Sequence, residues 1–191
     1  EISTIRPAAG FAAGTAVFDF RPPIASTENV FGMSMAAISI KATAANAGVA
    51  VHAQNLSLGK FEQIRVLNMA TALRLRDVWD SEFYSFKTDL CGSGTASPVV
   101  DLQPSAPGGS SNNNSFFGLQ LESYAGTPLY LGTDSHRNHF FGLKVHGLQP
   151  VANACVGVVL DGAEGRVFSG GHHASAVAAR LELRRGSDGN T

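Results

Sequence analysis

The sequence predicts an all-β fold, a right-handed single-stranded parallel β-helix (a solenoid) of about seven rungs. Three observations support it. A phrase of a small polar residue, an aromatic residue and two apolar residues one apart recurs along the 191 residues. A second short apolar pair follows each copy, and turns rich in Gly, Asn, Asp, Ser and Pro separate the pairs. Repetition at a period of about 20–50 residues is typical of stacked repeats, in which each unit needs its neighbours to bury its apolar face.

The recurring phrase predicts one interior column of side chains. Its copies are anchored at Met35, Phe61, Phe83, Phe116, Phe140 and Phe168, with gaps of 26, 22, 33, 24 and 28 residues. Unequal gaps fit loops of different length on coils of constant cross-section. Stacked strands lie about 4.8 Å apart, so we expect these six side chains to lie one above another.

The second apolar pair predicts a second strand in each rung, because in-and-out alternation with period two is strand behaviour. The pairs are Val49/Val51, Leu73/Leu75, Val100/Leu102, Leu129/Leu131, Val158/Leu160 and Leu181/Leu183. The longest gap holds the run 104–114, rich in Pro, Gly, Ser and Asn, which we expect to be an exposed loop. A β-sandwich is the alternative fold, but sandwiches have no repeated phrase at near-constant register.

The domain organisation predicted is a single β-helix domain over 1–191, with 1–28 as an early rung. Neither end carries a pattern that would cap an open rung, which would otherwise expose unpaired strand edges. We therefore expect this sequence to be an excerpt of a longer chain, or its ends to be covered by other chains.

The composition limits the kinds of partner that this sequence predicts. The formal net charge is −1 and 15% of residues are charged, which gives no electrostatic basis for binding nucleic acid. There is no apolar run long enough to span a bilayer, so no membrane insertion is expected. Cys91 and Cys155 fall two rungs apart, too far for a disulfide bond unless loops bring them together, and we expect buried free thiols. No Cys or His residues stand at ligand spacing, so neither a metal nor a cofactor is predicted.

Three stretches carry a resemblance to a known family. Asn29-Val30-Phe31-Gly32-Met33-Ser34-Met35, Val78-Trp79-Asp80-Ser81-Glu82-Phe83 and Asn112-Asn113-Asn114-Ser115-Phe116-Phe117-Gly118-Leu119 resemble the central rungs of phage tailspikes and related pectate-lyase-like β-helix proteins. The resemblance implies a homotrimer on a virion or in the extracellular space that binds, and often cleaves, a bacterial surface polysaccharide. A purely structural shaft segment, or a secreted polysaccharide lyase or hydrolase, are the alternatives.

Two outward columns predict a candidate catalytic site. Asp89, Glu122 and His146 fall on successive rungs, flanked by Lys87 and Lys144. Glycosidic cleavage needs two carboxyl groups about 5 Å apart in retaining enzymes and about 6.5–9.5 Å apart in inverting ones. Two neighbouring carboxylates would also raise the pKa of one of them, as a general acid requires. Asp89 and Glu122 are therefore the catalytic candidates, and the two lysines and His146 are candidate substrate ligands. The alternative is a solvated ladder of unlike charges.

A second candidate region surrounds Trp79, which follows Asp77 and precedes Asp80 at a turn between coils. A tryptophan beside carboxylates suits stacking on a sugar face, because its ring supplies apolar area with a polar edge. Tyr124 near the next turn would extend this substrate-binding surface. The alternative places Trp79 at a trimer interface or under a loop.

Overall fold

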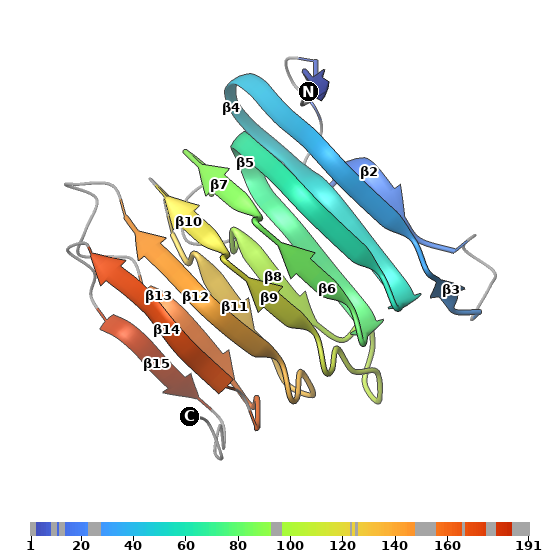
Figure 1. The fold of residues 1–191 in the computed structure, drawn as a ribbon, viewed down its shortest axis with the longest axis vertical. Helices are drawn as coiled ribbons and strands as arrows, with labels where there is room; N and C mark the ends of the chain where they lie inside the picture. Colours follow the sequence, from blue (N-terminus) through green and yellow to red (C-terminus); the bar gives the residue numbers. More distant parts are fainter. Residues whose placement is uncertain are drawn as a thin grey trace.

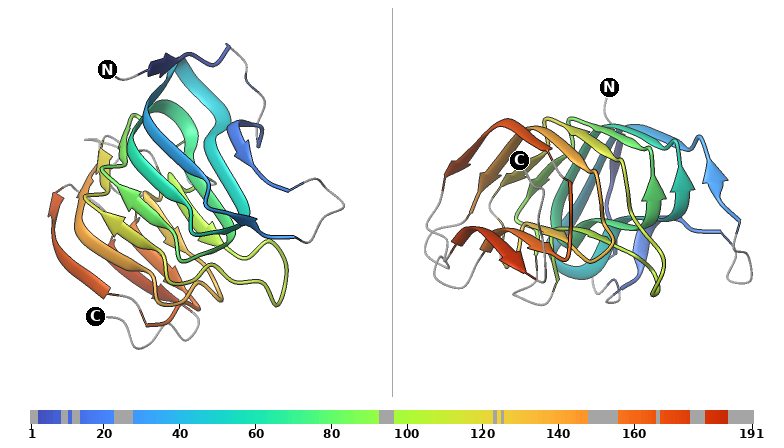
Figure 2. Two further views of the ribbon diagram at one scale, coloured as in Figure 1. Left: turned by 45° about the vertical axis from the view of Figure 1, so that its right-hand side comes forward. Right: turned by 90° about the horizontal axis from the view of Figure 1, so that it is seen from below.

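The chain folds as a parallel β-solenoid with no helix among the residues that the structure describes, as the sequence predicts (Figures 1 and 2). This computed structural model describes residues 3–8, 11, 14–22, 28–92, 97–122, 124, 126–147, 156–165, 167–174 and 179–184. The strands are β1 (Ser3–Ile5), β2 (Ala16–Phe20), β3 (Val30–Phe31), β4 (Ser34–Ser57), β5 (Lys60–Trp79), β6 (Glu82–Tyr84), β7 (Lys87–Asp89), β8 (Val100–Gln103), β9 (Ser115–Phe117), β10 (Gln120–Glu122), β11 (Leu129–Leu131), β12 (His139–His146), β13 (Val156–Asp161), β14 (Val167–Ala174) and β15 (Ala179–Arg184).

The solenoid has about five turns, fewer than the seven rungs expected. The long strands β4 and β5 each run around a whole turn, and β6–β8, β9–β11 and β12–β13 supply the next three. At the two ends, β1–β3 pair with β4, while β14 and β15 pair with β12 and β13. These end strands carry the same sequence pattern as the complete turns, and for this reason the sequence predicts too many rungs. The colours of Figure 1 follow this stack in chain order from the N-terminal to the C-terminal side.

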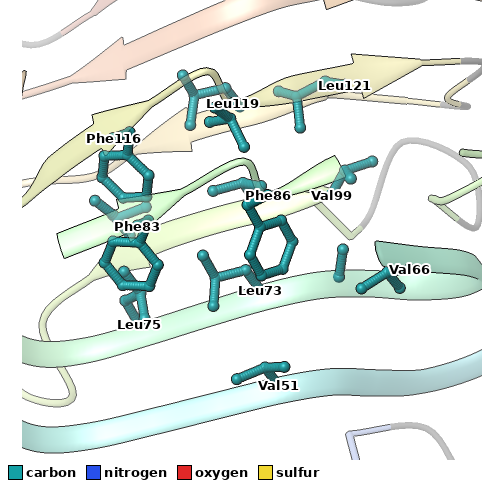
Figure 3. Packing of buried hydrophobic residues seen from close by; sticks show 14 of the residues in the cluster. Val51, Val66, Leu73, Leu75, Phe83, Phe86, Val99, Phe116, Leu119 and Leu121 are labelled. Atoms are coloured by element: carbon teal, nitrogen blue, oxygen red, sulfur yellow. The ribbon is translucent and has the colours of Figure 1, made fainter. Parts of the chain in front are cut away.

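The predicted aromatic column is confirmed. Strand pairing places Met35 beside Phe61, and the column continues through Phe83, Phe116, Phe140 and Phe168. From Phe61 onward the rings stack face to face, with centroids 4.9, 4.6, 4.7 and 5.0 Å apart. Figure 3 shows Phe83 and Phe116 over one another, with Leu73 and Leu75 beside them inside the coil. The core therefore runs along the solenoid axis.

Each turn bends at residues in the left-handed backbone region. One corner column contains Leu58, Asp80, Asn113 and Arg137, all with φ between 50° and 57°. Their backbone N–H groups donate to carbonyls of the next turn, as from Asp80 to Asn112 O at 3.2 Å and from Arg137 to Glu164 O at 3.1 Å. Asn, Asp and Gly adopt this conformation at low cost, which explains why turn residues recur at the corners.

Directly after this corner a polar ladder runs inside the coil. Ser81, Asn114 and Asn138 are fully buried. Ser81 N–H donates to Asn114 Oδ1 at 3.1 Å, and Asn114 N–H donates to Asn138 Oδ1 at 3.1 Å. The small polar residue of the recurring phrase thus satisfies the backbone at each corner. The run 104–114 is exposed at 105–108, as expected of a loop, whereas Ser111 and Asn114 within it are buried.

Cys91 is a buried free thiol, as expected, and it donates to Asp89 O at 3.4 Å. Burial raises its pKa to about 11. Cys155 lies outside the described residues.

Candidate functional site

The register brings the predicted charged residues together on one outer face. Strand pairing aligns Gln120 with Lys87 and Lys144, and it aligns Glu122 with Asp89 and His146. Both outward columns are therefore as the sequence predicts. They arise because β7, β10 and β12 are parallel and in register, so side chains from three separate turns meet on adjacent strands.

Glu122 is held by two lysines. Its Oε2 lies 2.9 Å from Lys87 Nζ, and its Oε1 accepts a hydrogen bond from Lys144 Nζ. Hydrogen bonds from Lys144 and then Lys87 lower the pKa of Glu122 to about 2. A raised pKa was expected for one carboxyl of this pair, and Glu122 shows the opposite. At ordinary pH the Glu122 carboxylate is ionised, and the two lysines balance its charge. A group in this state suits a structural or binding role better than that of a general acid.

Asp89 and His146 flank Glu122 in the same column. Asp89 is half-buried beside Leu67, and His146 is exposed. Lys87, Glu122 and Lys144 form a ladder of unlike charges on neighbouring strands, the kind of pairing that stabilises a sheet surface, whereas Asp89 is in register with Glu122, a second carboxylate.

An outer aromatic ladder lies next to these charges, and the sequence interpretation missed it. Tyr84, Phe117 and Phe141 are half-buried and stack with centroids 4.7 and 5.0 Å apart, and Lys60 Nζ lies 5.5 Å from the Tyr84 ring centroid. The sequence carries a signal for this ladder in its pairs of adjacent aromatic residues. Adjacent residues of a strand point to opposite faces, so the second ring of each pair lies outside the coil. The stacked rings cover one another's faces, which leaves mainly their edges for solvent. This ladder is therefore poorly suited to stacking on a sugar.

A cleft of about 690 Å³ opens at the corner that carries Trp79. Its lining residues are Trp79, Asp80, Asn112, Asn113, His136, Arg137, Glu164 and Gly165. They are equivalent positions of four successive turns, so the cleft runs along the solenoid axis over three strand spacings, about 14 Å. The sequence predicts Trp79 as a substrate ligand with Asp80 beside it, and the register of the repeat places the other lining residues next to these two.

Hydrogen bonds fix several cleft side chains. Trp79 Nε1 donates to Ser110 Oγ at 3.0 Å, which holds the indole against the loop 104–114. Asn113 Nδ2 donates to Asp80 Oδ1 at 2.5 Å. Asn112 Oδ1 accepts from the His136 backbone N–H at 2.7 Å. The indole is half-buried, and among the described residues no other ring stacks on it, in contrast to the two aromatic ladders.

The chemistry of the cleft combines one aromatic face with planar polar groups. Carboxylates at Asp80 and Glu164 accept hydrogen bonds, Arg137 donates them, and the amides do both. Arg137 and Glu164 are exposed, so these groups are available to a ligand. Such a set suits a neutral or weakly charged polyhydroxylated molecule with an apolar face.

Tyr124, the remaining candidate, does not reach either surface. It is 1% exposed and belongs to the hydrophobic core. Within the described part of the chain, no three His, Cys, Asp or Glu side chains gather as a metal-binding group. The same residues contain no helix long and apolar enough to cross a membrane.

Comparison of the chain with protein-family models, with curated proteins and with solved structures finds no match.

Proposed function

We propose that the protein is a glycan-binding domain of a fibre or tailspike type, and that the corner cleft beside Trp79 binds a bacterial surface polysaccharide. The observation that carries the proposal is the cleft itself, in which an unstacked indole lies among donors and acceptors from four turns. A virion or extracellular location and a trimeric assembly belong to the same proposal.

The cleft fits an extended oligosaccharide for physical reasons. Sugar rings present apolar C–H faces and polar edges, so one aromatic side chain and several planar polar groups match them. The cleft is elongated along the axis, because equivalent residues of successive turns line it. A rigid solenoid also fixes these groups before binding, which reduces the ordering cost of association.

The geometry favours binding over cleavage. Asp80 and Glu164, the two cleft carboxylates, lie on turns about three strand spacings apart, roughly 14 Å. That separation exceeds the 6.5–9.5 Å or so that an inverting glycosidase requires. On the outer face formed by β7, β10 and β12, the Glu122 carboxylate is bound by Lys87 and Lys144. Depolymerisation by Asp89 and Glu122 is thus the weaker form of the proposal.

A structural shaft is the second candidate function. The ion-pair ladder on Glu122 and the outer stack of Tyr84, Phe117 and Phe141 favour it, because both stiffen the sheet without any ligand.

Binding of the purified protein to a panel of bacterial capsular and lipopolysaccharide-derived glycans tests the proposal, with calorimetry on any hit. We expect Trp79→Ala to weaken binding about fivefold or more, since loss of aromatic stacking costs of the order of 1 kcal/mol or more. Phe141→Leu is the matched control, an outer aromatic outside the cleft, and should bind as the wild type does. Equal loss in both variants would contradict a site at Trp79.

Two further measurements separate the alternatives. Reducing-end detection after incubation reports cleavage, and Asp89→Asn and Glu122→Gln should abolish any cleavage that these residues perform. Light scattering reports the assembly, for which we expect a trimer. A stable oligomer that binds no glycan of the panel would favour the shaft.

A further inference from the structure

His52 is a buried histidine without a hydrogen-bond partner. It lies in β4 between the core residues Val51 and Ala53, on the outer side of the strand, and it is 6% exposed. Neither Nδ1 nor Nε2 has a hydrogen-bond partner among the described residues, although both atoms are buried. A neutral imidazole tolerates this position, whereas a charged imidazolium there would be desolvated and unpaired.

The charged groups around His52 come from three strands and one adjoining residue. Strand pairing puts it between Asp19 of β2 and Arg74 of β5, with Asp101 of β8 beyond Arg74. Arg21, which follows β2, and Arg76 of β5 also act on it electrostatically. The cluster therefore holds three guanidinium groups and two carboxylates.

Both carboxylates already have partners. Arg21 Nε donates to Asp19 Oδ1 at 2.6 Å, and a second hydrogen bond joins the same two side chains. Asp101 accepts from Gln103 Nε2 at 2.6 Å and from Arg76. A proton on His52 would thus add a fourth cation to a cluster in which both carboxylates already bind other side chains.

β2 is the element that can respond to this charge. Within the described residues it pairs with β4 alone. On the inner side Phe20 contacts the edge of Phe61, with ring centroids 5.8 Å apart. On the outer side Asp19 faces His52. All other turns could keep their pairing if β2 moved away, because β4 remains paired with β5.

We propose that His52 is an acid-sensitive latch, whose protonation releases β2 from β4 and uncovers the end of the apolar core. Above neutral pH the imidazole is uncharged and β2 stays docked. In acid the imidazolium gains water only when β2 leaves, so the open state takes up the proton.

The direction of the pH dependence follows from the closed state. Burial, and then Arg21, lower the pKa of His52 from 6.5 to about 4. A histidine pKa that is lower in the closed state than in the open state stabilises the closed state fully above about pH 6.5, and this stabilisation is lost as pH falls toward 4. The opening equilibrium should increase about 300-fold between its two limits, well above pH 6.5 and well below pH 4, since each pKa unit corresponds to a factor of ten.

Hydrogen exchange with mass spectrometry tests the latch, with rates corrected for the intrinsic effect of pH. In the wild type, opening of the segment 16–20 should increase about 20-fold between pH 7 and pH 5. His52→Gln, which cannot be protonated, should remove this dependence, and His146→Gln, at an exposed histidine, should retain it. Unchanged protection of 16–20 in the wild type at pH 5, or an unchanged pH dependence in His52→Gln, would overturn the proposal.

Arg21→Gln gives a second test if His52→Gln fails to fold, because Arg21 lies on the surface. This variant removes a cation and frees Asp19 for the imidazolium, so the pH dependence of exchange in 16–20 should become weaker than in the wild type. An equal or stronger dependence would contradict the latch.

Discussion

Phe83 and Phe116 stack with ring centroids 4.6 Å apart and 9° between their planes, although 33 residues of chain separate them. The chain between them contains the long loop that follows β8. The two rings are nevertheless as close as ring pairs joined by shorter stretches of chain. Loop length therefore varies without disturbing the interior register. The register is set by the aromatic column and by backbone pairing, and loops can differ between turns.

Truncation in the middle of this column should be costly. Phe116→Ala removes ring contacts with both Phe83 and Phe140 at a fully buried site. We expect the free energy of unfolding to fall by about 3–5 kcal/mol, the usual cost of removing a buried phenylalanine side chain. Urea denaturation followed by circular dichroism measures it. Phe117→Ala, next along the strand but half-buried in the outer ladder, is the control and should cost clearly less.

The buried polar ladder should also be intolerant of truncation. Asn114→Ala leaves the Ser81 N–H without its acceptor and removes the donor to Val78 O. An orphaned buried group costs about 1–3 kcal/mol, so the variant should lose at least that much stability. Asn113→Ala is the adjacent control at an exposed corner, where the left-handed backbone costs an alanine about 1–2 kcal/mol. A smaller loss in Asn114→Ala than in Asn113→Ala would contradict a stabilising ladder.

Much of the fold could be predicted because the interior and outer columns follow from two simple rules. Side chains alternate along a strand, and parallel strands of a solenoid stack in register, so Phe116 and Glu122 could be placed beside their partners from the sequence. The number of turns could not, because partial end strands carry the same pattern as complete turns.

The candidate site was predictable only in part. Its residues are brought together by corners whose shape depends on positive-φ positions such as Asp80 and Arg137, and an arginine is not a recognisable turn residue. Tyr124 was misjudged because it lies outside the assigned strands, where strand alternation does not predict which way a side chain points. The pKa of Glu122 depends on which side chains reach it, and the column alone does not determine that.

The thiol of Cys91 should be unreactive in the folded protein. Its pKa is raised to about 11 by burial, and the thiolate is the reactive species. At pH 8 we expect iodoacetamide to leave Cys91 unmodified in buffer and to alkylate it fully in 6 M guanidinium chloride. Peptide mapping by mass spectrometry distinguishes it from Cys155. Rapid alkylation of Cys91 under native conditions would show that this part of the core opens readily.

The ion pairs on Glu122 should make a contribution to stability that depends on pH. The pKa of Glu122 is lowered from 4.5 to about 2, so its contribution is complete above about pH 4.5 and is lost as pH falls toward 2. Glu122→Gln should therefore lower the free energy of unfolding by about 1–2 kcal/mol at pH 7, a value reduced for the partial exposure of the two lysines.

Urea denaturation of both proteins from pH 7 to pH 2 measures this contribution. The difference between wild type and Glu122→Gln should narrow below pH 4.5 and nearly vanish at pH 2. Glu62→Gln is the matched control, because its ion pair with Lys60 is exposed and should change the free energy of unfolding less than the ion pairs of Glu122 do. A difference for Glu122→Gln that stayed constant down to pH 2 would mean that packing, and not the charge of the carboxylate, accounts for the loss.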